Sequence, residues 1–152
     1  AGELLYSTLY KFGFANSGEP LDASGWANPA LQLTDCRITN AAKCLPPENK
    51  PTGDEIKICN GYLAEELAGL PAGAIILALG NIAHQAVLKA SKCRVAEYRF
   101  GHHARHTLPN GRMLYDSYHC SRYNTQTRRL TEAMFHQVFS SITEDLKCLT
   151  ST

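Results

Sequence analysis

The chain has 152 residues and a mass of 16.7 kDa, enough for one domain that buries a sizeable core. With 44% hydrophobic residues, 19% charged residues and a net charge of +1, it is typical of a globular protein, and a mainly disordered chain is excluded. No apolar run approaches the roughly 20 residues of a membrane-spanning helix, and the first residues do not resemble a secretory signal. We therefore expect one domain over residues 1–152, a cytoplasmic location and no membrane contact.

Helical and extended patterns alternate along the chain. Apolar residues at helical spacing predict helices, and short alternating or continuous apolar runs predict strands. In chain order these are a helix at residues 3–12, a strand at 33–40, a helix at 52–70, a strand at 74–80, a helix at 82–90, a strand at 113–118 and a last helix after residue 131. This alternation predicts an α/β fold of three layers, αβα, with a small and mostly parallel sheet.

Polar residues stand where three of these helices begin. Thr52 and Glu55 fit a capping box, in which the Thr oxygen accepts an amide hydrogen bond and the Glu side chain returns one. Asn81 and Thr131 directly precede the third and the last helix, where short polar side chains satisfy free amides. We therefore expect all three residues that precede these helices to act as N-caps.

The carboxyl ends of the predicted strands are the first place to look for a site, because open parallel sheets bind ligands there. Asn40, Gly80 and His119 each lie at or just beyond such an end. Two long segments without periodicity, residues 15–31 and 93–111, are expected to be functional or mobile loops.

The charge of the chain is unevenly distributed. Residues 94–129 contain seven arginines and two acidic residues, together with four histidines. Arginine binds phosphate in a bidentate manner and stacks on bases, so this excess favours an anionic polymer or a phosphate-bearing partner. A solvated surface with no such partner is the alternative.

Six cysteines without any Cys-x-x-Cys pair favour reduced thiols or a metal site over a disulfide framework. Cys44 and Cys59 bracket a proline-rich loop and could furnish half of a four-cysteine iron–sulfur site. Taken alone, each is more often a buried, small apolar side chain. A zinc site is the other possibility, and its candidate ligands are Cys93, His102, His103 and His106.

Residues 116–131 form a second informative stretch. His119 leaves a predicted strand and is followed by hydroxyl, amide and guanidinium side chains before the last helix. Such a loop can contact phosphates while the histidine faces a pocket, although a structural histidine in a solvated loop has the same pattern. Asn40 offers a donor and an acceptor, enough to read one edge of a pyrimidine, or it simply forms a turn.

Taken together, these stretches resemble the uracil-DNA glycosylase superfamily, and most closely its iron–sulfur branch of broad substrate range, called family 5 and related to family 4. The matching motifs span nearly the whole chain in the family's order. They are residues 37–40 (Arg-Ile-Thr-Asn), 43–51 (Lys-Cys-Leu-Pro-Pro-Glu-Asn-Lys-Pro), Cys59 with 62–63, 78–80 (Ala-Leu-Gly), 100–102 (Phe-Gly-His), 117–121 (Ser-Tyr-His-Cys-Ser), 124–125 and 129–131.

The resemblance implies an enzyme that hydrolyses the N-glycosidic bond of uracil or another deaminated base in DNA after flipping the base out of the duplex. His119 resembles the histidine that stabilises the departing base, and Asn40 the asparagine that lines the base pocket. Cys44 and Cys59 resemble two of four ligands of a 4Fe-4S cluster. The residues that resemble the DNA-contacting loop are Ser121, Asn124, Thr125, Arg128 and Arg129. We expect a monomer that binds damaged DNA.

The chain also departs from the family. Cys120 stands where the family's loop has proline, which removes a fixed backbone dihedral beside His119, and we expect looser geometry there. The family's water-positioning motif, its base-stacking aromatic residue, its first strand and two cluster cysteines have no counterpart here. We therefore expect an N-terminally incomplete domain with reduced activity. A non-catalytic DNA-binding remnant and a small zinc protein are the competing functions.

Overall fold

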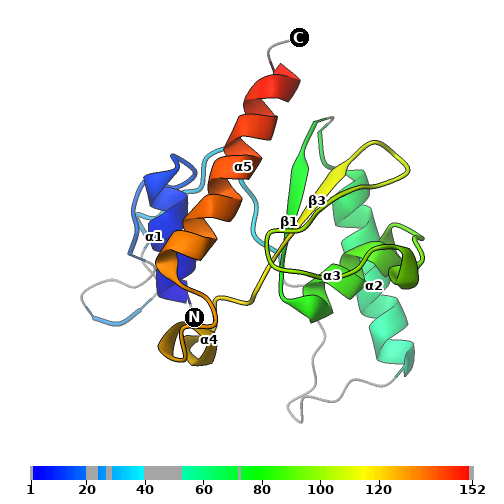
Figure 1. Cartoon of the computed structure of the whole chain (residues 1–152), viewed down its shortest axis with the longest axis horizontal. Helices are drawn as coiled ribbons and strands as arrows, with labels where there is room; N and C mark the ends of the chain where they lie inside the picture. The colour runs from blue at the N-terminus through cyan, green and yellow to red at the C-terminus, as the bar shows by residue number, and fades with distance from the viewer. Residues whose placement is uncertain (1, 20–23, 27–28, 40–52, 72, 151–152) are drawn as a thin grey trace. The chain divides into compact units, whose positions relative to one another are not determined.

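The computed structural model describes residues 2–19, 24–26, 29–39, 53–71 and 73–150 (Figure 1). The chain divides into two compact units. The first unit comprises Ala1–Ile38 and Tyr118–Thr152, and the second comprises Thr39–Ser117. In chain order the elements are α1 (Gly2–Lys11), α2 (Gly53–Ala68), β1 (Ile75–Leu79), α3 (Asn81–Ala90), a 3-10 turn (Val95–Glu97), β2 (Arg105–Thr107), β3 (Met113–Ser117), α4 (Arg122–Gln126) and α5 (Glu132–Thr150).

The second unit contains a mixed three-stranded sheet with the order β1-β3-β2. The strands β1 and β3 are parallel, with Ile75 opposite Met113 and Leu79 opposite Ser117. The short strand β2 runs antiparallel to β3. The predicted α/β class and the parallel pairing of the two apolar strands are therefore confirmed. The strand β2 lies in the segment that the sequence predicted to be a loop.

The core of the second unit lies where α2 and α3 pack with the sheet. Leu88 of α3 and Leu114 of β3 are fully buried, and Leu63 of α2 and Ala78 of β1 are almost as inaccessible. Burial of one leucine side chain contributes about 1.5–3 kcal/mol, so these contacts fix the two helices on the sheet. The strand predicted at residues 74–80 contains β1, in which Ala78 is buried and the other four residues are half-buried.

The junction between β1 and α3 depends on a glycine. Gly80 has φ 97° and ψ 165°, a conformation that side chains disfavour, and its amide donates to the carbonyl of Ser117 at 2.8 Å. This hydrogen bond brings together the ends of β1 and β3. The prediction that Asn81 caps this helix is wrong, because Asn81 is itself the first helical residue and Gly80 is the N-cap.

In the first unit, α1 packs against α5 (Figure 1). The ring centroids of Phe12 and Phe139 are 5.6 Å apart, and Phe135 and Val138 of α5 are fully buried. The hydroxyl of Thr131 accepts the amide of Met134 at 3.2 Å. The cap predicted at Thr131 is thus confirmed, as are the first and last helices.

The strand predicted at residues 33–40 is wrong over the described residues 33–39, which contain only an isolated bridge between Leu33 and Ala15. Asp35 explains the difference, because its φ of 52° interrupts an extended backbone, and most of the neighbouring side chains are exposed. The short helix α4 was not predicted either. Thr52 of the predicted capping box lies outside the described residues. Among the described residues, no helix is long and apolar enough to span a membrane.

Candidate functional site

The candidate site is the polar segment that follows β3, residues 118–131, which we call the His119 loop. Its turn into α4 is set by Ser121, the N-cap residue, with an extended backbone at φ −66° and ψ 155°. The Ser121 hydroxyl accepts the amide of Asn124 at 3.2 Å. Serine is a preferred N-cap because its short side chain satisfies a free amide of the first turn. The predicted DNA-contacting Ser121 therefore shapes the loop.

Asn124 fixes the backbone of His119. Its side-chain amide donates to the His119 carbonyl at 2.9 Å, and its own carbonyl accepts the amide of Leu130 at 3.1 Å. Leu130 is buried, so the far end of the loop is anchored in the core of the first unit. The side chain of His119 is exposed. The loop thus presents an accessible imidazole on a restrained backbone.

Three arginines of the loop face solvent. Arg122, Arg128 and Arg129 are all exposed, and the guanidinium carbon of Arg129 lies 4.9 Å from the centroid of the Tyr118 ring. This stacking is a cation–π contact that restrains Arg129 without neutralising it. The hydroxyl of Thr125, by contrast, donates within α4 to the carbonyl of Arg122 at 3.0 Å. The arginines are therefore the charged groups that the loop offers to a partner.

Tyr123 is a residue of the loop that sequence reasoning missed. It belongs to the first turn of α4, and 72% of its surface is exposed. An aromatic ring so exposed between arginines is suited to stacking on a base. Its exposure could not be seen in the sequence, because α4 was not predicted.

Cys120 lies beside His119 but is buried, with 4% of its surface exposed. Desolvation by burial raises the pKa of the Cys120 thiol, which keeps the thiol protonated and unreactive at neutral pH. The backbone of this segment is restrained by the hydrogen bonds of Ser121 and Asn124. These contacts supply a restraint at the position where we expected looser geometry.

Arg128 has a left-handed backbone, with φ 59°, just after α4 ends. A non-glycine residue pays a steric penalty in this conformation. We expect Arg128→Gly to stabilise the protein by about 0.5–1 kcal/mol, after the greater flexibility of glycine in the unfolded chain is allowed for. Urea unfolding measures this change, with the exposed Arg122→Gly in the helix as the matched control, which should destabilise. Equal destabilisation by both variants would contradict the strain at Arg128.

The remaining predicted site residues are not gathered by the described part of the chain. Asn40 and Cys44 lie outside the described residues, and Cys59 is placed only as a backbone position in α2. The assignment of Cys44 and Cys59 to an iron–sulfur cluster therefore rests on the sequence motif. The four cysteines with described side chains belong to no group of three or more metal-ligating residues; they are Cys36, Cys93, Cys120 and Cys148.

The four residues predicted as alternative zinc ligands are not gathered into one cluster among the described residues either. Of these four candidates, only His106 belongs to a cluster of possible ligands among the described residues, and its neighbours there are His84 and Asp116. Cys93 instead points its thiol at the carbonyl of Ser91, 3.6 Å away. Sequence reasoning missed His84 and Asp116, which read as residues of a helix and a strand.

An exposed histidine on a restrained backbone lies in an arginine-rich loop that directly follows a parallel strand of this α/β protein, an arrangement that favours an anionic ligand. Residues 1–146 match the family model described as the uracil DNA glycosylase superfamily. The chain belongs to this superfamily, which confirms the fold and the family that the sequence motifs predicted.

Individual relatives agree with this assignment. The chain is 40% identical over 138 residues to a type-5 uracil-DNA glycosylase of Thermus thermophilus, covering 91% of this chain and 61% of the relative. It is 33% identical over 145 residues to a type-5 uracil-DNA glycosylase of Pyrobaculum aerophilum, covering 95% and 61%. A type-4 uracil-DNA glycosylase of Archaeoglobus fulgidus is 38% identical over 60 residues, covering 39% and 30%. The chain spans about three fifths of the length of the two type-5 relatives.

Proposed function

We propose that this protein is a uracil-DNA glycosylase, which hydrolyses the N-glycosidic bond of uracil or another deaminated base in DNA after the base has flipped out. The observation that carries the proposal is the exposed His119, whose backbone is held by the 2.9 Å hydrogen bond from Asn124 within a loop of exposed arginines. The family match through residues 1–146 supports it, and it also supports treating both units as parts of one glycosylase domain.

His119 is the proposed catalytic residue. As the bond to the sugar breaks, negative charge develops on the departing base, and a donor placed beside it lowers the energy of the transition state more than that of the bound substrate. A fixed backbone reduces the reorganisation that such a donor needs. The contact between Asn124 and the His119 carbonyl therefore makes Asn124 a positioning residue.

The loop is the proposed DNA contact. Arg122, Arg128 and Arg129 would neutralise phosphates on the strand beside the flipped base, which makes binding weaken with salt. Ser121 and Thr125 use their hydroxyls within the loop, so in this proposal they shape it. Monomeric binding to damaged DNA stays part of the proposal.

The resemblance assigns the remaining roles. Asn40 would read the edge of the flipped base, and Cys44 and Cys59 would supply two of the four thiolates of a 4Fe-4S cluster. Analysis of the purified protein for iron and acid-labile sulfide tests the cluster. Stoichiometric zinc in place of iron would contradict it.

The experiment that tests the function is excision of uracil from a labelled duplex, with cleavage of the resulting abasic site as the readout. We expect product from a duplex with a single uracil and none from the same duplex with thymine. The second candidate function is DNA binding without catalysis, which the exposed arginines of the His119 loop would support by themselves. Binding of uracil-containing duplex without any excision would support that candidate and contradict the first.

Tyr123→Ala should weaken the complex with damaged duplex by about 1–3 kcal/mol, because stacking of an exposed ring on an unstacked base contributes about this much. Binding titrations with duplexes that contain an abasic-site analogue measure the loss. Tyr10→Ala is the matched control, since Tyr10 is also an exposed tyrosine of the first unit, with 56% of its surface accessible, but belongs to α1. Equal affinities of both variants would exclude Tyr123 from the interface.

A further inference from the structure

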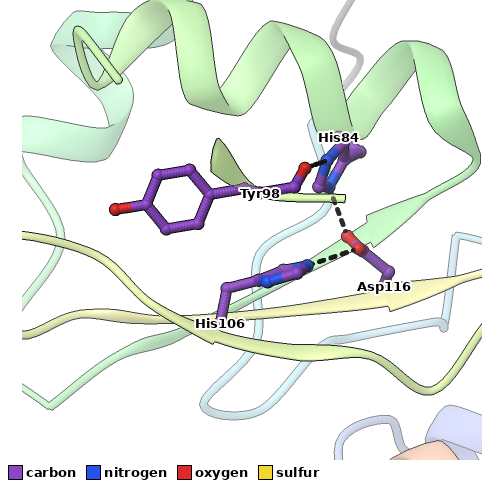
Figure 2. Close-up of polar contacts among 4 residues, drawn as sticks. All are labelled: His84, Tyr98, His106 and Asp116. Atoms are coloured by element: carbon purple, nitrogen blue, oxygen red, sulfur yellow. Dashed lines mark hydrogen bonds and ion pairs between the residues drawn. The ribbon is translucent and has the colours of Figure 1, made fainter. Parts of the chain in front are cut away.

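Three titratable side chains meet inside the second unit, and none of them belongs to the His119 loop (Figure 2). Asp116 of β3 lies between His84 of α3 and His106 of β2, and Asp116 and His84 are essentially inaccessible to solvent. The carboxylate oxygens of Asp116 are 2.8 Å from Nδ1 of His84 and 2.9 Å from Nε2 of His106. The other ring nitrogen of His84, Nε2, is 2.7 Å from the backbone carbonyl of Tyr98.

The partners of His84 determine where its protons lie. A backbone carbonyl can only accept a hydrogen bond, so Nε2 must carry a proton and donate to Tyr98. Nδ1 faces a carboxylate oxygen at 2.8 Å, and this short contact also requires one proton between the two atoms. The His84–Asp116 pair therefore holds one proton more than a neutral imidazole and an ionised carboxylate have together.

Two arguments place the shared proton on the ring. An imidazole is ordinarily a stronger base than a carboxylate. In addition, the second oxygen of Asp116 lies 2.9 Å from Nε2 of His106, and a hydrogen bond donated by that nitrogen favours the charged form of the carboxylate. His84 is then an imidazolium, Asp116 a carboxylate and His106 a neutral ring with its proton on Nε2. The three groups balance their charges without solvent.

The same aspartate holds a strained turn. The amide of Ala104 donates to the carbonyl of Gly101 at 3.0 Å, which closes a turn over residues 101–104. His103 in this turn has φ 66°, a left-handed conformation that costs a non-glycine residue about 1–3 kcal/mol. The backbone of Asp116 accepts from His103 at 2.8 Å and donates to Ala104 at 2.9 Å.

We propose that His84, Asp116 and His106 form a buried ionic clamp, in which a doubly protonated His84 holds the end of β3 and thereby positions the strained turn of residues 101–104. The clamp joins α3, β2 and β3 through one residue, Asp116, whose backbone bonds the turn directly (Figure 2). Asp116 and His84 are therefore positioning residues. The protonation of His84 and Asp116 is independent of the proposed function. A role of the turn in base excision, by contrast, rests on the proposed function.

The protonation is tested by nitrogen-15 NMR of the histidine rings in the wild-type protein at neutral pH. We expect both ring nitrogens of His84 to show a directly bonded proton, because burial slows exchange of these protons with water. His136 of the first unit, which is partly exposed, is the internal reference. An unprotonated Nδ1 of His84 would overturn the proposal. So would stoichiometric binding of added Zn²⁺ that removes the Nδ1 proton, since two imidazoles and a carboxylate are also a zinc donor set.

The positioning is tested by amide hydrogen exchange in Asp116→Asn, which retains only one side-chain acceptor oxygen. We expect the His103 amide to exchange at least about tenfold faster than in the wild type, and the Phe135 amide in α5 of the first unit to be unchanged. His106→Gln, which keeps an amide donor, should preserve more protection than His106→Leu. Unchanged exchange at His103 in Asp116→Asn would overturn the positioning role.

In excision assays of the same variants we expect a lower kcat and an unchanged KM. If the wild-type protein excises no uracil, that result contradicts only the proposed function.

Discussion

Replacing His119 with Ala should slow uracil excision by about 10²–10³-fold, while the affinity for the damaged duplex stays nearly unchanged. The size of the effect follows from removing one donor that acts on charge developing in the transition state. Affinity is retained because the exposed arginines of the loop, which bind the phosphates in our proposal, are untouched. Single-turnover rates at saturating enzyme separate the chemical step from binding and product release.

Two further variants serve as comparisons for the excision rate of His119→Ala. His136→Ala removes another histidine of the first unit, whose ring packs edge-on against Phe12 at 6.0 Å, and should leave the rate constant unchanged. Asn124→Ala removes the side chain that holds the His119 carbonyl and should give an intermediate loss. If His119→Ala excises at the wild-type rate, His119 is not the donor and the proposed mechanism is wrong.

The parts of the fold that could be predicted are those in which burial leaves a periodic pattern. The apolar run that becomes β1 and the helical spacing of α5 are direct consequences of packing on a core, and both were found. The edge strand β2 is a run of Arg, His and Thr whose extended form comes from pairing with β3. Only a short turn that contains Asn110 and Gly111 separates the two strands, so the local sign of this hairpin was its turn and not the pattern of its side chains.

The strand expected at residues 33–40 shows the opposite error. Its alternating side chains satisfy a strand pattern, but alternation is informative only when one face is buried, and Thr34 and Arg37 are both exposed. The amide of Thr34 donates to the carbonyl of Phe14, which ties this segment to the end of α1 in the first unit. That pairing is again decided by tertiary structure.

The candidate site was predictable to the extent that its chemistry is carried by residue type. The histidine and arginines of the His119 loop could be named as candidates because they follow a predicted strand end, where parallel sheets bind ligands, and because the motif around them resembles a known family. The roles of Asn124 and Ser121 as internal supports could not, since a polar side chain in a loop looks the same whether it bonds DNA or its own backbone. His84 and Asp116 are 32 positions apart, and only the fold brings them together.

Asp116→Ala should destabilise the protein by about 3–5 kcal/mol, the second large effect that we expect. The substitution removes the acceptor of both histidines at once and leaves the His84 ring, which is 1% exposed, with an uncompensated charge or an unpaired donor. Urea unfolding gives the change from the transition midpoint, and an unchanged slope would show that the surface exposed on unfolding is the same.

A double substitution separates loss of charge pairing from loss of packing. His84→Phe combined with Asp116→Ala removes both charges, so we expect it to be more stable than Asp116→Ala alone, because buried ion pairs can be replaced by apolar groups at little cost. Glu97→Ala, an exposed acidic residue of the same unit, should change the free energy of unfolding by less than about 0.5 kcal/mol. If Asp116→Ala has an effect as small as that control, or if the double variant is the less stable of the two, the contact between His84 and Asp116 is not a buried ion pair, and the clamp does not hold the end of β3.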